Sequence, residues 1–227
     1  MSRCVVALAT DHVRFAPALL SPAVWQQSAE MGGKRRPLFL AGRLLLATLM
    51  REYFGCGTLP EIRYAAEGKP AFCDTTLPHF SISHSGHQVL VAVCQVGEIG
   101  ADIETLRPRA SMLSLAQTLF SQSEYDWFLK QGDQQRAAFW QLWTLREALL
   151  KQQGRSVWQM ASVSVDPLLQ HFSGASAPLQ LVSAVQADVA LALALPLGVT
   201  HIEVLQADAN GALSPWSAAW RTFLAHH

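Results

Sequence analysis

The sequence predicts an α+β fold made of two similar lobes that meet near residue 98. Both halves of the 227-residue chain show helical patterns followed by strand patterns, an order typical of α+β proteins. Half of the residues are hydrophobic and 15% are charged, a balance that suits a globular chain with a real core. Glycines separate the short apolar runs between residues 80 and 104, as expected for strands. We therefore expect an N-terminal lobe, 1–98, and a C-terminal lobe, 99–227.

The expected N-terminal lobe begins with a strand and two helices. Ser21 is a candidate N-cap and Pro22 suits the first helical position, so together they mark the start of a short helix. The glycines and the proline of "FGCGTLP" end the second helix. The elements expected up to residue 70 are a strand at 4–9, helices at 22–31 and 38–53, and a strand that leads into a turn at 67–70.

Three β-like segments follow and cross the expected lobe boundary. Residues 80–83 and 99–104 alternate apolar and polar side chains, which is typical of half-buried strands. Residues 89–94 form a continuous apolar run, which is typical of a strand buried on both faces. Gly86 and Gly97 separate the three segments.

The C-terminal lobe repeats the order of helices and then strands. The pattern becomes helical after Pro108, and Gly154 closes the last and longest helix. The helices are expected at 111–120, 123–130 and 134–152, and the strands at 163–166, 179–185, 189–195 and 201–205.

Composition excludes several classes of protein. A formal net charge of zero gives no general attraction for nucleic acid, so an anion site requires a local basic cluster. The apolar run from Val189 is too short to span a bilayer, and the N-terminus lacks the pattern of a signal peptide. The four cysteines show no CxxC spacing, which suits a reducing compartment. We therefore expect a cytoplasmic protein that binds neither nucleic acid nor membrane.

Two carboxylates stand one residue apart in the strand expected at 99–104. Asp102 and Glu104 share one face of such a strand. Like charges this close repel each other, and burial strengthens the repulsion. A lone D-x-E pattern is more often the solvent face of a strand, so the pair alone does not identify a site.

The helix expected at 134–152 has two unlike faces. An apolar stripe predicts its core side, and the opposite face carries Trp140, Trp143, Glu147 and Lys151. Tryptophans are seldom left on a solvated face, so we expect another lobe or a ligand to cover this one. Glu147 and Lys151 stand four residues apart and can pair. An ordinary surface ion pair is the alternative interpretation.

The carboxylates of Asp102, Glu104 and Glu147 together indicate a hard cation. Three carboxylates near one point require neutralising charge, and oxygen ligands suit Mg²⁺ or Mn²⁺ rather than Zn²⁺. Mg²⁺ often shares the phosphate oxygens of a substrate, which gives nearby basic and hydroxyl groups a role. The candidates are Lys34 with its neighbours Arg35 and Arg36, then Arg43, Lys69, Ser83 and His84. The chain has no GxxxxGK[ST], GxGxxG or GxSxG motif, so a covalent intermediate is not indicated.

Five motifs that follow one another in a fixed order make the functional interpretation specific. They are "EGKPAF" (67–72), "FSISHSGHQVLVAV" (80–93), "IGADIE" (99–104), "FSQSEY" (120–125) and "FWQLWTLREALLKQQG" (139–154). This series resembles the 4′-phosphopantetheinyl transferases of the surfactin-synthetase-activating type, and most of all the bacterial holo-[acyl-carrier-protein] synthase 2 branch. The G-x-D-x-E strand and the W-x-x-[KR]-E-x-x-x-K helix carry most of the resemblance, which covers residues 34–154.

The resemblance implies a pseudo-dimer of two α+β lobes with the active site in the cleft between them. It implies transfer of the 4′-phosphopantetheine moiety of coenzyme A to a serine of an apo acyl (or peptidyl) carrier protein, with release of adenosine 3′,5′-bisphosphate. Such reactions serve fatty acid or polyketide biosynthesis. One chain would supply both sides of the cleft, so a monomer is expected.

The resemblance also implies roles for single residues. Glu147 or Glu124, directly or through a water, would act as general base, and Lys151 would stabilise or protonate the leaving phosphate. The ligands of Mg²⁺, or of Mn²⁺ in its place, would be Asp102, Glu104 and Glu147. The contacts of coenzyme A would be Lys34, Arg43, Lys69, Ser83 and His84.

Some positions leave their roles open. Arg146 stands where the family usually has lysine, which keeps the charge but changes the donor geometry. Arg107 and Arg109 belong either to a basic patch for an acidic carrier protein or to a solvated loop. Neither the identity of the carrier nor the role of residues 155–227 follows from the sequence.

Two other functions compete with an active transferase. The first is a catalytically silent module that binds a carrier protein or coenzyme A, and the intact carboxylates and Lys151 argue against it. The second is a Mg²⁺-dependent enzyme acting on another nucleotide. The ordered motifs and the lack of a P-loop argue against the second.

Overall fold

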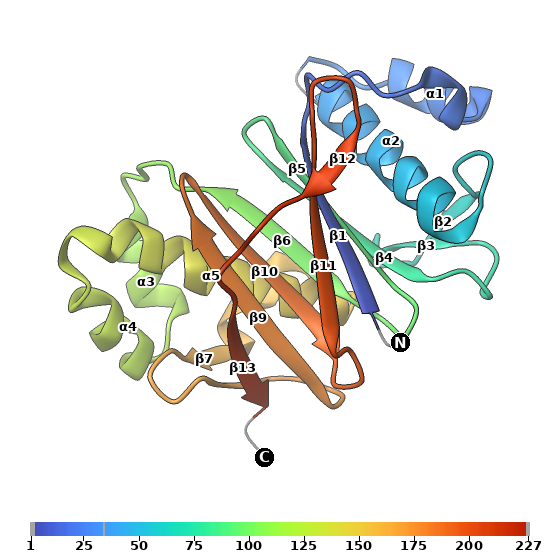
Figure 1. Ribbon diagram of the computed structural model, residues 1–227. Coiled ribbons are helices and arrows are strands. Elements are labelled where there is room, and N and C mark those ends of the chain that lie inside the picture. The colour runs from blue at the N-terminus through green and yellow to red at the C-terminus, as the bar shows by residue number, and fades with distance from the viewer. Residues whose placement is uncertain (1–2, 34, 226–227) are drawn as a thin grey trace.

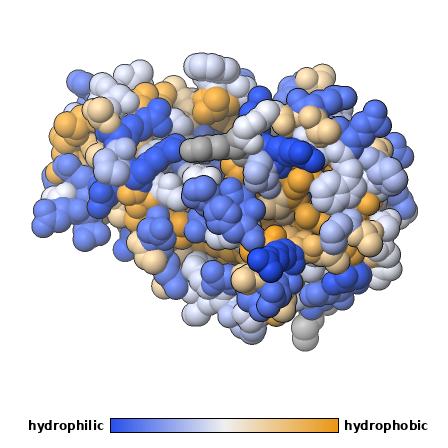
Figure 2. Space-filling view, turned by 90° about the horizontal axis from the view of Figure 1, so that it is seen from above, coloured by the Kyte–Doolittle hydropathy of each residue, from blue (hydrophilic) through white to orange (hydrophobic). Residues whose placement is uncertain are grey.

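The computed structural model describes residues 3–33 and 35–225 of the chain. They form a mixed α+β structure with two main sheets and one small hairpin, which confirms the predicted class (Figure 1). Polar residues cover much of the face seen from above, and apolar residues are exposed in patches between them (Figure 2). Among the described helices, none combines the length and the apolar character needed to cross a bilayer.

The first sheet has five strands in the order β12-β11-β1-β5-β4. These are β1 (Arg3–Thr10), β4 (His79–Ser85), β5 (Gln88–Cys94), β11 (His201–Ala207) and β12 (Leu213–Pro215). The sheet packs against helix α2 (Arg35–Phe54), and α1 (Pro22–Ala29) packs on α2 (Figure 1). The remaining elements on this side are a 3-10 turn, η1 (Pro17–Leu19), and the hairpin of β2 (Ile62–Tyr64) with β3 (Pro70–Phe72).

The second sheet has six strands in the order β6-β10-β9-β13-β8-β7. They are β6 (Gly100–Thr105), β7 (Ser164–Asp166), β8 (His171–Ser173), β9 (Leu179–Gln186), β10 (Val189–Pro196) and β13 (Arg221–Ala225). Helix α5 (Gln135–Gln152) packs on this sheet, with α3 (Met112–Leu119) and α4 (Gln122–Leu129) at the far end of the molecule (Figure 1). The 3-10 turns are η2 (Gly132–Gln134) and η3 (Val157–Ser162).

Sheet membership does not follow the expected division at residue 98. Strands β11 and β12 lie in the part of the chain assigned to the C-terminal lobe, yet β11 pairs in parallel with β1. The pattern of a strand shows that it is half-buried but not which distant strand it joins. The division into lobes 1–98 and 99–227 stays a prediction, and in the structure the strands at 201–207 and 213–215 belong to the first sheet.

The strand alternation separates small from large side chains. In β10 the alanines at 190, 192 and 194 face the core under α5, whereas the leucines at 191, 193 and 195 face the other way. Those leucines meet side chains of β1 and β5 in a shared core between the two sheets. The small alanine face lets α5 lie close to the second sheet, and the leucine face fills the space between the sheets.

Gly100, the first residue of β6, sets the distance between β6 and α5. A Cβ atom at this position would lie 1.9 Å from the carbonyl oxygen of Ala148 and 2.5 Å from the amide nitrogen of Gln152. Both are backbone atoms of the helix and cannot turn aside as a side chain would. The glycine of the G-x-D-x-E motif is therefore a packing requirement.

We predict that Gly100→Ala lowers the free energy of unfolding by about 3 kcal/mol, because the new methyl group forces α5 away from β6. Gly97→Ala is the matched control, since its Cβ would meet only Pro196 Cγ, at an ordinary 3.5 Å. Urea unfolding of the parent and both variants measures the difference. Equal midpoints for the two variants would contradict the packing argument.

Candidate active site

The site lies where β4 and β6, the facing edge strands of the two sheets, come together. Serines at alternate positions of β4 bridge the gap with their hydroxyl groups. Ser81 Oγ accepts from Ala101 N (3.0 Å), Ser83 Oγ donates to Asp102 Oδ1 (2.7 Å), and Ser85 Oγ donates to Glu104 Oε2. The alternation of "FSISHS" is a signal for this row of serines, but we assigned Ser83 to a ligand and not to the neighbouring strand.

Asp102 is the most deeply buried carboxylate of the site, with 2% of its surface exposed. Its Oδ1 accepts a second hydrogen bond from Lys151 Nζ, 2.5 Å away. Its Oδ2 is buried and has no hydrogen-bond partner among the described residues. A buried carboxylate oxygen without a donor is costly, so Oδ2 is suited to receive a cation.

Lys151 joins α5 to both edge strands. Its Nζ lies 2.9 Å from Ser83 Oγ and 3.6 Å from Glu147 Oε2, in addition to its contact with Asp102. Burial opposes the ammonium charge, but the carboxylate of Asp102 and then that of Glu147 outweigh burial and raise the pKa of Lys151. The side chain therefore stays protonated at neutral pH.

Glu147, one turn before Lys151 on α5, accepts a hydrogen bond from Trp143 Nε1 (2.9 Å). Burial, followed by the charge of Asp102, raises the pKa of Glu147 to about 7. Burial also raises the pKa of Glu104. Negative charge is thus held at a cost in both groups, and a cation would relieve it.

The donor set of Asp102, Glu104 and Glu147 fits Mg²⁺ or Mn²⁺, because these ions prefer carboxylate oxygens. Within the described residues the oxygens of the three groups do not all lie within 4.8 Å of one another. Lys151 contacts two of the three carboxylates directly. The residues can hold a hard cation once their side chains converge on it.

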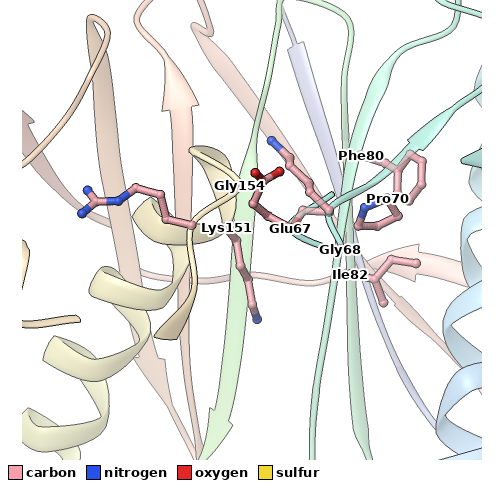
Figure 3. Close-up of a pocket in the computed structure, with 10 residues that line it drawn as sticks. Glu67, Gly68, Pro70, Phe80, Ile82, Lys151 and Gly154 are labelled. Carbon is pink, nitrogen blue, oxygen red and sulfur yellow. The ribbon is translucent and has the colours of Figure 1, made fainter. Parts of the chain in front are cut away.

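A cavity of about 210 Å³ opens beside Lys151. Figure 3 shows Glu67, Pro70 and Phe80 on one wall, with Lys151 and Gly154 at the end of α5 on the other. Arg155 also lines the cavity and was missed in the sequence, where the motif ends at Gly154. Gly154 adopts a left-handed backbone (φ 66°) that turns the chain out of the helix and places Arg155 at this rim.

The other predicted coenzyme A contacts are spread more widely. Lys69 lines the cavity, but its ammonium pairs with the carboxylate of Glu98 and donates to Gln152 O (2.6 Å). His84 lies on β4 with much of its side chain exposed. The burial of the rest of its ring, and then the charge of Lys151, lower the pKa of His84. Arg43 lines a different cavity and donates to the hydroxyl of Tyr64 at 2.6 Å. Lys34 lies outside the described residues.

The tryptophan face of α5 is covered by the loop that follows β6. Trp140 is fully buried and its Nε1 donates to Arg107 O (3.0 Å). The guanidinium group of Arg109 lies 5.1 Å from the ring centre of Trp143. We expected another lobe or a ligand on this face. In the structure the loop that follows β6, in the same polypeptide chain, covers the tryptophans instead. Arg107 and Arg109 therefore have a packing role through their contacts with the tryptophans.

A sequence model of the 4′-phosphopantetheinyl transferase superfamily matches residues 98–194. The 4′-phosphopantetheinyl transferase AcpT of Escherichia coli O157:H7 is 42% identical over 147 residues, which are 64% of this chain and 71% of that protein. The chain belongs to the 4′-phosphopantetheinyl transferase superfamily. The 4′-phosphopantetheinyl transferase ffp of Bacillus subtilis is 36% identical over 121 residues, or 52% of each chain. These relatives confirm the resemblance carried by the motifs and make the chain an enzyme of the superfamily.

Arg146, the departure from the superfamily's usual lysine, has a structural partner. Arg146 and Glu124 are fully buried and form an ion pair between α5 and α4. Glu124 Oε1 also accepts from Val165 N, and its Oε2 from Ser121 N, both at 2.6 Å. With its oxygens engaged and shielded from solvent, Glu124 has no path to a substrate proton. This burial argues against the predicted role of Glu124 as a general base.

We predict that Glu124→Gln lowers the free energy of unfolding by about 3 kcal/mol, because it leaves Arg146 buried without a charged partner. Transferase turnover per folded molecule should stay near that of the parent. Asp126→Asn, an exposed carboxylate of the same helix, is the control and should change stability by less than about 0.5 kcal/mol. Loss of turnover in a fully folded Glu124→Gln protein would restore the catalytic role.

The raised pKa of Glu147 predicts how stability depends on pH in the absence of divalent metal. The folded protein keeps this proton up to pH about 7, whereas the unfolded chain releases it near the ordinary value of 4.5. The folded state therefore binds more protons in this window, and its stability falls as pH rises through it. Glu147→Gln should remove a decline on the order of 1–3 kcal/mol, measured by urea unfolding between these two pH values. Parallel profiles for parent and variant would contradict the assignment.

Proposed function

We propose that the protein transfers the 4′-phosphopantetheine moiety of coenzyme A to a serine of an apo acyl or peptidyl carrier protein, and releases adenosine 3′,5′-bisphosphate. The observation that carries the proposal is the contact of Lys151 with Asp102 and Ser83, at the wall of the cavity. The relatives named as 4′-phosphopantetheinyl transferases support the choice of reaction.

Asp102, Glu104 and Glu147 would hold Mg²⁺ in this reaction. The bound ion would neutralise the charge that develops on the pyrophosphate of coenzyme A. The buried Oδ2 of Asp102 without a protein donor supports this assignment, as do the raised pKa values of the two glutamates. Mn²⁺ accepts the same ligands and is the alternative ion.

Lys151 would act on the leaving phosphate, and Glu147 would act on the proton of the carrier serine. The ammonium of Lys151 stays protonated and can stabilise or protonate the leaving phosphate. Glu147 has a raised pKa of about 7 without bound metal, and its carboxylate can accept the serine proton directly or through a water. Its position beside Lys151, and the burial of Glu124, favour Glu147 as the general base.

Coenzyme A would lie along the cavity between the turn at 67–70 and the end of α5. Lys69 and Arg155 line this cavity and would face its phosphates, and Ser83 would orient Lys151. His84, on β4 outside the cavity lining, would join them as the resemblance implies. Arg43, in its own cavity, is the outlying member of the predicted set. Lys34 is proposed as a further contact of coenzyme A because of the resemblance. The resemblance also supports two lobes related as a pseudo-dimer and a monomer that acts in the cytoplasm.

Intact-mass spectrometry of a panel of apo carrier proteins tests the function. With coenzyme A and Mg²⁺, we expect one carrier serine to gain one phosphopantetheine, and chelation of the metal to abolish the gain. Asp102→Asn and Glu147→Gln should each lower turnover by about 100-fold or more without loss of fold. Asp133→Asn, an exposed carboxylate near the start of α5, is the control and should retain turnover.

Thermal unfolding supplies an independent measurement. Mg²⁺ with coenzyme A should raise the melting temperature of the parent protein, because ligands that bind only the folded state stabilise it. The increase should be smaller in Asp102→Asn. A parent that binds coenzyme A but modifies no carrier is a silent binding module, and that outcome would overturn the proposal.

A further inference from the structure

A second group of metal-ligating side chains lies outside the candidate active site, at the end of β1. Asp11, His12 and His87 each offer one ligand atom, and these atoms all lie within 4.8 Å of one another. His87 lies within the motif at 80–93, but the proposed transferase chemistry gives none of the three residues a role. Two imidazoles beside one carboxylate are a donor set that carboxylate-rich Mg²⁺ sites do not share.

The backbone brings the three residues together. Thr10 at the end of β1 pairs with Gln88 at the start of β5, so Asp11 falls opposite the turn that joins β4 to β5. That turn contains Gly86, whose φ of 60° is the conformation that a tight two-residue hairpin needs. Asp11 N donates to His87 O at 3.0 Å, which fixes the two residues against each other.

The side-chain geometry suits a tetrahedral ion. His87 Nδ1 lies 3.1 Å from Asp11 Oδ1, and His12 Nε2 lies 3.3 Å from the same oxygen. Ligand atoms about 2.0–2.1 Å from a tetrahedral Zn²⁺ lie about 3.3 Å apart. The two nitrogen–oxygen separations are close to this value, and all three ligand atoms lie within 4.8 Å of one another.

Burial divides the group into a fixed base and an open side. The Asp11 side chain is 8% exposed, whereas those of His12 and His87 are 76% and 62% exposed. The two imidazole rings stack on each other, with ring centres 5.1 Å apart. An ion can enter from solvent and bind an unprotonated nitrogen of each imidazole. Water molecules can then complete its coordination shell.

We propose that Asp11, His12 and His87 form an accessory site for Zn²⁺ or a similar borderline divalent ion. The bound ion would tie the end of β1 to the β4–β5 turn. This turn directly follows Ser85, whose hydroxyl donates to Glu104. The site is distinct from the carboxylate cluster in donor chemistry, so the two sites select different metals.

Isothermal titration of the full-length protein with Zn²⁺, in an excess of Mg²⁺ that fills carboxylate sites, tests the proposal. We expect one Zn²⁺ equivalent to bind the parent protein. His12→Ala, His87→Ala and Asp11→Asn should each weaken this binding by about tenfold or more, since even outer contacts of a metal site contribute that much. His201→Ala, an exposed histidine at the start of β11, is the matched control and should bind as the parent does.

Co²⁺ absorption adds a readout that does not depend on fold or activity. Co²⁺ at the site should give the strong visible bands of a four-coordinate ion, without the thiolate bands expected if Cys56 or Cys73 were the ligands. The bands should be lost in His87→Ala with the melting temperature unchanged. A parent that binds no Zn²⁺ in excess Mg²⁺, or variants that bind it as tightly as the parent, would overturn the proposal.

Discussion

Lys151 binds Ser83 of the first sheet and Asp102 of the second sheet with the same ammonium group. An ammonium that is partly withdrawn from solvent, as that of Lys151 is, is stabilised where carboxylates and hydroxyls surround it. The Nζ atom of Lys151 therefore joins three elements: the end of α5, the edge strand β4 and the edge strand β6. Gly100 makes the contact possible because it lets the helix backbone lie against β6. The cavity beside Lys151 follows from the same arrangement.

Among the described residues, helix α5 forms one ion pair with α4 and one with β6, and the two serve different purposes. Arg146 meets Glu124 on the side of α4, where backbone amides engage both oxygens of the carboxylate and solvent is excluded. Lys151 meets Asp102 on the side of the cavity, where Asp102 Oδ2 is left without a partner among the described residues. The carboxylate of Glu124, with both oxygens engaged, joins elements of the fold, whereas the open oxygen of Asp102 can respond to a ligand. Arg146 and Lys151 are only five residues apart in sequence. The side of α5 on which each side chain lies decides whether its ion pair joins two helices or faces the cavity.

Much of the site was accessible from sequence because it rests on short-range periodicity. The alternation of β6 put Asp102 and Glu104 on one face, and the helical spacing of α5 put Glu147 beside Lys151. The α+β class and most helices and strands followed from the same patterns. Long-range packing was not accessible: the burial of Glu124, the covering of Trp140 by the loop after β6, and the bridging serines all depend on elements far apart in sequence. Strands β8, β12 and β13 are three to five residues long and carry too few side chains to show a pattern.

The parallel pairing of β1 with β11 has a consequence for synthesis of the chain. β1 leaves the ribosome when nearly two hundred residues, including its partner at His201–Ala207, have yet to be made. Until then one edge of an apolar strand stays open, and an open apolar edge is where chains join one another by mistake. Early pairing of β1 with β5 protects only the other edge. A nascent chain halted before residue 201 would therefore depend on chaperones to keep its first sheet from aggregating.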